Sequence, residues 1–94
     1  MDRLEHIESR LTEGLAATHV DVEDESHLHA GHAGARSGGG HFRAVIVSER
    51  FAGLSRVARQ RVVYGALGDL MKGEIHAFSM RTFTPDEWKA ASGG

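Results

Sequence analysis

The chain contains no cysteine. This absence excludes a disulfide framework, a thiol nucleophile and any metal site built only from thiolates of this chain. Long apolar runs are missing as well, since no stretch approaches the roughly 18 apolar residues of a transmembrane helix. Residues 1–5 also lack the basic and apolar regions of a secretory signal peptide. We therefore expect a cytoplasmic protein with no membrane partner.

The composition that remains is that of a small globular protein. Of the 94 residues, 40% are hydrophobic and 26% are charged, whereas a disordered chain has fewer apolar residues and more charge. The length predicts a single domain over residues 1–94. A chain of this size buries only about 60–65% of its unfolded surface, so one thin core must hold it together.

Charge is distributed unevenly along the chain, although the formal net charge is only −2. Residues 1–25 carry eight acids and two bases, while residues 36–61 carry six arginines and one acid. Such asymmetry hints at a local anionic partner. Four of these arginines are candidate phosphate contacts: Arg50, Arg56, Arg59 and Arg61. The more frequent role of such arginines is a solvated helix face.

Hydropathy patterns predict six regular elements. They are helices over 2–16 and 55–71, strands over 19–25, 41–48 and 74–83, and a last helix that begins at Thr84. The run Thr84-Pro85-Asp86-Glu87 is a strong helix start, because a capping residue precedes proline and a glutamate follows three residues later. A glycine-rich loop over 30–40 and a tail over 90–94 are expected to be flexible.

The order α-β-β-α-β-α predicts an α+β fold. The first two strands can pair as an antiparallel hairpin, and the long helix provides a crossover to a parallel third strand. A three-stranded mixed sheet with helices covering one face is a two-layer sandwich.

Histidines are the candidate metal ligands, because neutral imidazole is a common ligand. His27 and His29 lie two residues apart in a segment that also contains His32, although solvated loop histidines are the commoner case. Strand alternation places His76 on the same face as Phe78 and Met80. There it is equally compatible with a core residue and with an exposed ligand at the end of the sheet.

The sequence supports neither KH-type nucleic-acid binding nor catalysis. Gly31-His32-Ala33-Gly34 and Gly65-Ala66-Leu67-Gly68 both match the GxxG string of nucleic-acid-binding KH domains, but neither is placed between two helices. No activated nucleophile or pair of catalytic acids is visible, so a non-enzymatic protein is expected.

Several segments, taken together in their order and spacing, resemble the BolA-like protein family from about Ile7 to Trp88. The most specific are Val22-Glu23-Asp24-Glu25-Ser26-His27, Gly40-His41-Phe42-Arg43-Ala44-Val45-Ile46-Val47-Ser48, Phe51-Ala52-Gly53-Leu54-Ser55-Arg56, Arg59-Gln60-Arg61-Val62-Val63-Tyr64, Ile75-His76-Ala77-Phe78-Ser79 and Thr82-Phe83-Thr84-Pro85-Asp86-Glu87-Trp88.

This resemblance implies a KH-like version of the α+β sandwich and partnership with a monothiol glutaredoxin. In the family, a [2Fe–2S] cluster is shared between the glutaredoxin cysteine, a glutathione thiolate and one or two ligands of the BolA-like protein. The ligand in the third strand matches His76. The second ligand, in the loop between the first two strands, matches His29 best, with His27 as its rival. No cluster is expected in the isolated chain.

The resemblance also implies an alternative role in transcription, through DNA contacts of a helix-turn-helix-like segment. The arginine-rich region agrees with that role. Many family members carry Arg-His-Arg where this chain has Arg59-Gln60-Arg61, so a role of the central imidazole is in doubt here.

Overall fold

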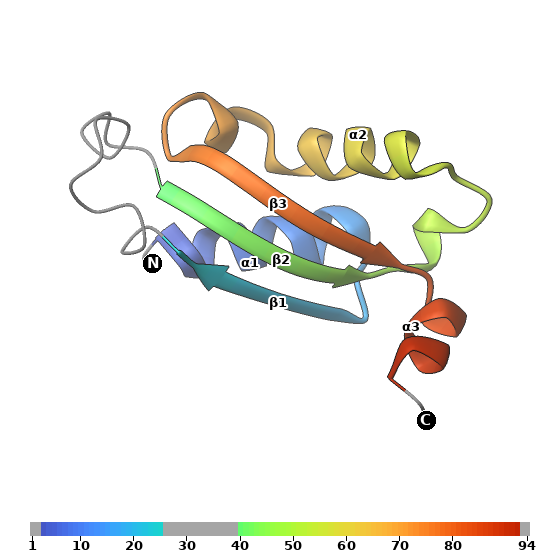
Figure 1. The fold of residues 1–94 in the computed structure, drawn as a ribbon. Helices are drawn as coiled ribbons and strands as arrows, with labels where there is room; N and C mark the ends of the chain where they lie inside the picture. Colours follow the sequence, from blue (N-terminus) through green and yellow to red (C-terminus); the bar gives the residue numbers. More distant parts are fainter. Residues whose placement is uncertain (1–2, 26–39, 93–94) are drawn as a thin grey trace.

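The computed structural model describes residues 3–25 and 40–92 (Figure 1). The chain forms α1 (Arg3–Leu15), β1 (His19–Asp24), β2 (Gly40–Val47), the 3₁₀ helix η3 (Glu49–Phe51), α2 (Arg56–Leu67), the 3₁₀ helix η4 (Gly68–Lys72), β3 (Ile75–Phe83) and α3 (Pro85–Ala91). The predicted element order and α+β class are confirmed. The predicted loop up to residue 39 and the candidate ligands His27 and His29 lie outside the described residues.

The three strands form one mixed sheet in the order β1-β2-β3. β1 pairs antiparallel with β2, from His19 opposite Val47 to Asp24 opposite Phe42. β2 pairs parallel with β3, and α2 lies in the connection between them. The hairpin and crossover expected from the sequence are therefore present, and β1 and β3 are the two edges of the sheet.

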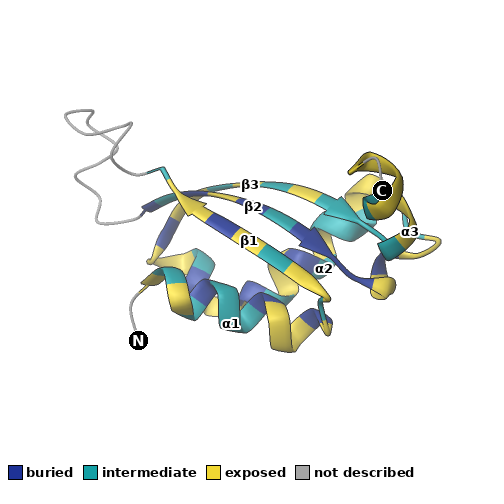
Figure 2. Cartoon of the chain, turned by 90° about the horizontal axis from the view of Figure 1, so that it is seen from below, coloured by how far each residue is buried: buried dark blue, intermediate teal, exposed yellow. Residues whose placement is uncertain are grey.

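One face of the sheet is covered by α1 and α2, and the core lies between these layers (Figure 2). Apolar residues three and four apart on α1 share one helix face, and alternate residues on β2 share one sheet face. The core accordingly contains Ile7, Leu11, Leu15, Phe42, Ala44, Ile46, Val63 and Leu67.

The two covering helices approach closely at Gly14. A Cβ built on Gly14 would lie 3.0 Å from the Cβ of Ala66 on α2. The missing side chain therefore lets the end of α1 pack tightly against α2, although glycine costs helix stability.

The last helix lies at the end of β3 rather than over the main core (Figure 1). It begins with the predicted capping box, in which Thr84 and Glu87 each bond the backbone of the other. The ring of Trp88 packs 5.3 Å from that of Phe83 and stacks on His19 at 5.0 Å. These contacts hold α3 against the end of the sheet.

Two details differ from the sequence-based predictions. The helix expected over 55–71 ends at Leu67, because Gly68 adopts a φ of +56° and the chain continues as η4. Strand β3 has a register shift: Gly40 pairs with Ile75, but His41 pairs with Ala77. The prediction that His76 shares a face with Phe78 and Met80 is wrong, because Ile75 and Phe78 both pack on the core and His76 is the extra residue between them.

No helix within 3–25 or 40–92 combines the length and apolarity needed to cross a membrane.

Candidate functional site

His76 lies at the start of β3 and is exposed. As the extra residue of a β-bulge it has no partner on β2, and bulges commonly redirect a side chain in this way. Of the two environments compatible with the sequence, the structure shows the exposed one. The imidazole of His76 is therefore accessible to another molecule.

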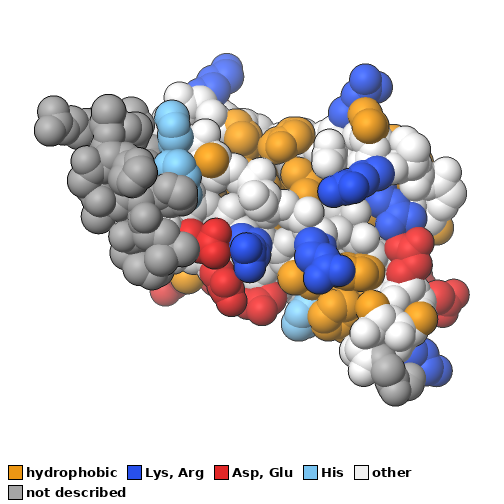
Figure 3. Space-filling model, in the orientation of Figure 1, with side chains coloured by type: hydrophobic (Ala, Val, Ile, Leu, Met, Phe, Trp, Pro, Cys, Tyr) orange, Lys and Arg blue, Asp and Glu red, His pale blue; other side chains and the backbone are white. Residues whose placement is uncertain are grey.

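His41, at the start of β2, lies beside His76. The two ring centroids are 5.1 Å apart and the rings are tilted by 48°. Phe42 points into the core, so His41 lies on the opposite face of the sheet, which α1 and α2 leave open. Figure 3 shows histidine side chains at the end of the molecule where β2 and β3 begin.

The sequence-based predictions did not include this histidine pair. A signal was nevertheless present. Both histidines stand near the start of a predicted strand, and the two strands were expected to be parallel. Neighbouring parallel strands begin at the same end of a sheet, so side chains near their first residues lie close together.

The histidine pair offers imidazole nitrogens as donor atoms. Within the described ranges no group of three or more histidine, cysteine, aspartate or glutamate side chains is arranged to hold a metal ion. Two neighbouring imidazoles can supply two ligands, and a complete site then needs further ligands from elsewhere. The residues therefore fit a metal group whose remaining ligands come from a partner.

Arg59, one of the four candidate phosphate contacts, is instead mostly buried and bonded to other parts of the protein. Its guanidinium donates two hydrogen bonds to the carboxylate of Glu87, at 2.7 and 3.1 Å, and further bonds to the carbonyls of Leu54 and Thr82. Only 13% of its side chain is exposed. Arg59 thus joins α2 to β3 and α3, and the expectation that it is solvated is wrong.

The contact between Arg59 and Glu87 shifts the titration of both groups. Hydrogen bonds from Arg59, and then from the Thr84 backbone, lower the pKa of Glu87 from 4.5 to about 2. The hydrogen bond to Glu87 raises the pKa of Arg59 above its ordinary value. Both groups remain charged over the physiological range.

The other three candidate arginines differ among themselves. Arg50 donates a 2.8 Å hydrogen bond to the carbonyl of Gly14 and so supports the end of α1. Arg56 and Arg61 are exposed on α2. Across residues 3–25 and 40–92 neither has an ion pair, so these two remain available to an anion.

A groove lies at the far end of β3 from the histidine pair. Its volume is about 600 Å³, and it is lined by the start of α2, the end of β3 and the first turn of α3: Leu54, Arg56, Arg59, Gln60, Met80, Arg81, Thr82, Phe83 and Glu87. Figure 3 shows arginine and lysine side chains gathered at this end of the molecule.

The fold and the histidine pair define the class of protein: an α+β sandwich with a three-stranded mixed sheet that presents imidazoles and no thiol at one end. The family model described as "BolA-like protein" matches residues 11–87. The chain belongs to the BolA-like protein family.

Known proteins and structures agree with this assignment. The chain is 37% identical to the "DNA-binding transcriptional regulator BolA" of Haemophilus influenzae over 84 residues, covering 89% of this chain and 79% of that protein. It is 36% identical to human "BolA-like protein 1" over 86 residues, covering 92% of this chain and 61% of the human protein. The crystal structure of a Bol-like protein from Babesia bovis matches with a TM-score of 0.80 and 36% identity, covering 98% of this chain and 95% of that one.

Proposed function

We propose that this protein is a non-enzymatic adaptor that binds a monothiol glutaredoxin and contributes histidine ligands to a shared [2Fe–2S] cluster, in iron–sulfur trafficking or in iron or redox sensing. The observation that carries the proposal is the exposed His76 beside His41 at one end of the sheet, in a chain without cysteine. Cysteine of the glutaredoxin and the thiolate of glutathione would supply the sulfur ligands.

His76 is the first ligand in this proposal. The second comes from His29, with His27 as its rival, and the position of His41 adds a third candidate. Because β1 ends at Asp24 and β2 begins at Gly40, the segment that carries His27 and His29 starts and ends at the same end of the sheet as His76. Histidine ligation in place of cysteine raises the reduction potential of a [2Fe–2S] centre.

Reconstitution of the chain with a monothiol glutaredoxin, iron, sulfide and glutathione tests the proposal. Visible absorption and circular dichroism would be recorded for the wild type and for His76→Ala, His41→Ala, His29→Ala and His27→Ala. We expect His76→Ala to change the visible spectrum and to speed loss of the cluster to a chelator. One of the other three variants should have a similar effect and thereby identify the second ligand.

His19→Ala is the matched control, because His19 is an exposed histidine at the other end of the same sheet. It should leave the cluster spectrum unchanged. If His76→Ala behaves like His19→Ala while both chains still bind the glutaredoxin, His76 is not a ligand. If no complex with a glutaredoxin forms at all, the adaptor role itself is wrong.

DNA binding is the second candidate function, supported by the name of the Haemophilus influenzae relative, a DNA-binding transcriptional regulator, and by the exposed Arg56 and Arg61. Each arginine that contacts a phosphate contributes about one unit to the slope of log K against log salt. The double variant Arg56→Gln/Arg61→Gln should therefore lower the slope by about two units. A wild-type chain that does not bind duplex DNA at low salt would rule this function out.

The cytoplasmic location remains a prediction. Fluorescence microscopy of the tagged chain in its own cells tests it, and accumulation in an organelle would contradict it.

A further inference from the structure

We propose that the groove at the end of β3 binds an extended, acidic peptide segment of a partner protein, which adds as a fourth strand to the sheet. This site is separate from the histidine pair. His76 and Arg81 are five residues apart on one strand, a distance of about 17 Å at strand spacing.

The backbone of β3 provides hydrogen-bonding groups with which a peptide can pair. β3 is an edge strand, and four consecutive residues near its end, Met80 to Phe83, line the groove. The carbonyl of Phe83 accepts a hydrogen bond from Ser48 on the β2 side, whereas the carbonyl of Thr82 accepts one from Arg59 on the groove side. Since successive carbonyls of a strand point in opposite directions, the backbone groups of Met80 also face the groove. Because Arg59 already occupies the carbonyl of Thr82, an extended peptide would pair with the backbone groups of Met80 and with the N–H of Thr82.

The charged side chains that line the groove favour an acidic peptide. Among the described residues, Glu87 is the one acid that lines the groove, and Arg59 already pairs with it. Arg56 and Arg81, which also line the groove, are exposed and have no ion pair with any residue in the described part of the chain. The groove therefore carries two positive charges that no carboxylate in the described ranges pairs with.

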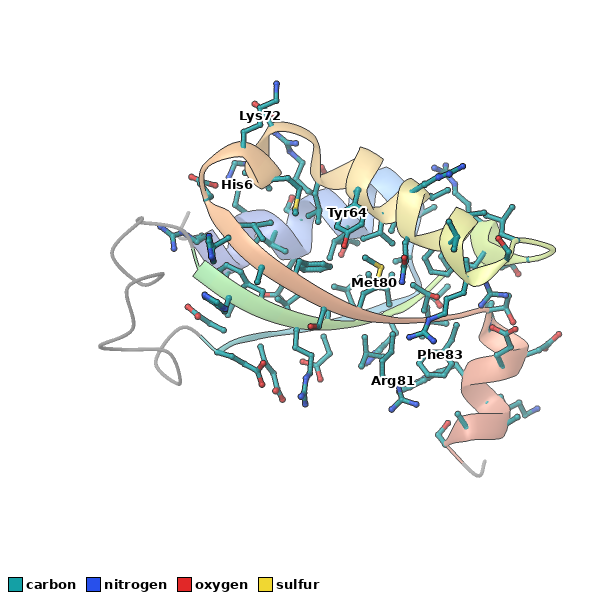
Figure 4. The ribbon with its side chains drawn as sticks, turned by 45° about the horizontal axis from the view of Figure 1, so that its top comes forward. His6, Tyr64, Lys72, Met80, Arg81 and Phe83 are labelled. Carbon is teal, nitrogen blue, oxygen red and sulfur yellow. The ribbon has the colours of Figure 1, made fainter. Side chains whose placement is uncertain are left out.

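The two arginines lie on different faces of the sheet. In Figure 4, Met80 points toward α2, while Arg81 and Phe83 point to the opposite side of β3. The side chains of an added strand alternate between these faces. Acidic residues on one face would lie opposite Arg81, and apolar residues on the other face would contact Met80 and Leu54.

The surface of α2 extends this site along the strand. Arg56, Gln60 and Tyr64 are spaced four residues apart, so they form one row on the helix. The first two line the groove, and Tyr64 is 41% exposed. Its ring offers an apolar surface with a polar tip, which is typical of residues at protein interfaces.

A peptide of alternating valine and aspartate, eight residues long and labelled with fluorescein, tests the proposal by fluorescence anisotropy at low salt. We expect saturable binding. The same peptide should shift the amide NMR signals of Met80, Arg81, Thr82 and Gln60. Arg81→Gln should weaken binding by about three- to fivefold, which is the scale of one cross-strand charge pair. Arg56→Gln should weaken it by less, because Arg56 lies on the side of α2, where the peptide carries valine.

Arg61→Gln is the matched control, because Arg61 is an exposed arginine of α2 that does not line the groove. It should leave the affinity unchanged. A peptide with four valines followed by four aspartates has the same composition without the alternation, and it should bind at least tenfold more weakly. Thr82→Pro removes an N–H on the groove side of an edge strand, where proline is tolerated, and should weaken binding further.

Four outcomes would overturn the proposal. The first two are binding of the alternating peptide that does not saturate up to about 1 mM, and equal affinity for the block peptide. The other two are an Arg61→Gln effect as large as that of Arg81→Gln, and a thymidine octanucleotide that binds more tightly and shifts the same amide signals. Sedimentation velocity of the protein alone tests whether a second copy of this chain occupies the groove. Concentration-dependent self-association that Arg81→Gln abolishes would assign the groove to a second copy of this chain instead.

Discussion

The hydroxyl of Ser48 donates a 2.7 Å hydrogen bond to the carbonyl of Leu15, which joins the end of β2 to the end of α1. Ser48 is buried among the core residues, with no exposed surface, and its oxygen also accepts from the N–H of Arg50. One side chain thus satisfies two backbone groups that belong to different elements.

Replacing Ser48 with alanine leaves the Leu15 carbonyl buried without this donor. We expect Ser48→Ala to lower the free energy of unfolding by about 1–3 kcal/mol, as measured by urea denaturation. Ser79→Ala is the control, because Ser79 is exposed on β3, and its effect should stay within about 0.5 kcal/mol. Equal effects of the two variants would show that the buried hydrogen bond contributes nothing.

The contact between Arg59 and Glu87 should make stability depend on pH. The folded pKa of Glu87 is about 2, below its ordinary value of 4.5, so the stabilisation is fully present above pH 4.5 and is lost as the pH falls toward 2. Glu87→Gln should therefore unfold at lower urea than the wild type near neutral pH, and the difference should shrink through this window.

Glu13→Gln, at an exposed acid of α1, is the control for general effects of losing one negative charge. If the wild type and Glu87→Gln differ equally at pH 7 and at pH 2, the ion pair is not the cause.

Two helix glycines should respond differently to alanine. An added Cβ at Gly65 meets nothing within 4 Å, so Gly65→Ala should stabilise the protein by about 0.5–1 kcal/mol through helix propensity. At Gly14 the same Cβ would lie 3.0 Å from that of Ala66. Gly14→Ala should therefore gain less than Gly65→Ala, or destabilise. Thermal unfolding of the two variants compares them directly, and a larger gain at Gly14 would contradict the tight packing of α1 on α2.

Trp88 should report on the attachment of α3, because it is the only tryptophan in the chain. Its contacts with Phe83 and His19 predict slow quenching of its fluorescence by acrylamide. Trp88→Leu should cost about 1–2 kcal/mol, whereas Lys89→Ala on the exposed side of α3 should be nearly neutral. Rapid quenching in the native protein would mean that α3 is not held against the sheet.

The sequence was sufficient for the order of the elements, for the mixed sheet and for most of the core, because these follow from local hydropathy patterns and from capping residues such as Thr84. It was insufficient where a contact joins distant parts of the chain. Arg59 carries the signature of a solvated helix residue, and only the folded chain brings Glu87, 28 positions away, to its guanidinium.

The candidate metal site was also only partly predictable from the sequence. That the ring of His76 is exposed could not be decided from strand alternation, since one extra residue in β3 changes which face each later side chain occupies. The neighbourhood of His41 and His76 depends on the same register. Whether His29 or His27 is the loop ligand stays a prediction, because both lie outside the described residues.

The extra residue in β3 has a consequence for how position 76 can change during evolution. Because this position has no partner on β2 and its side chain does not fill the core, neither strand pairing nor core packing requires a particular side chain there, and its ring contact is with His41. Stability alone would let the residue drift. A histidine retained at this position among related chains would therefore reflect selection for its chemistry rather than for the fold.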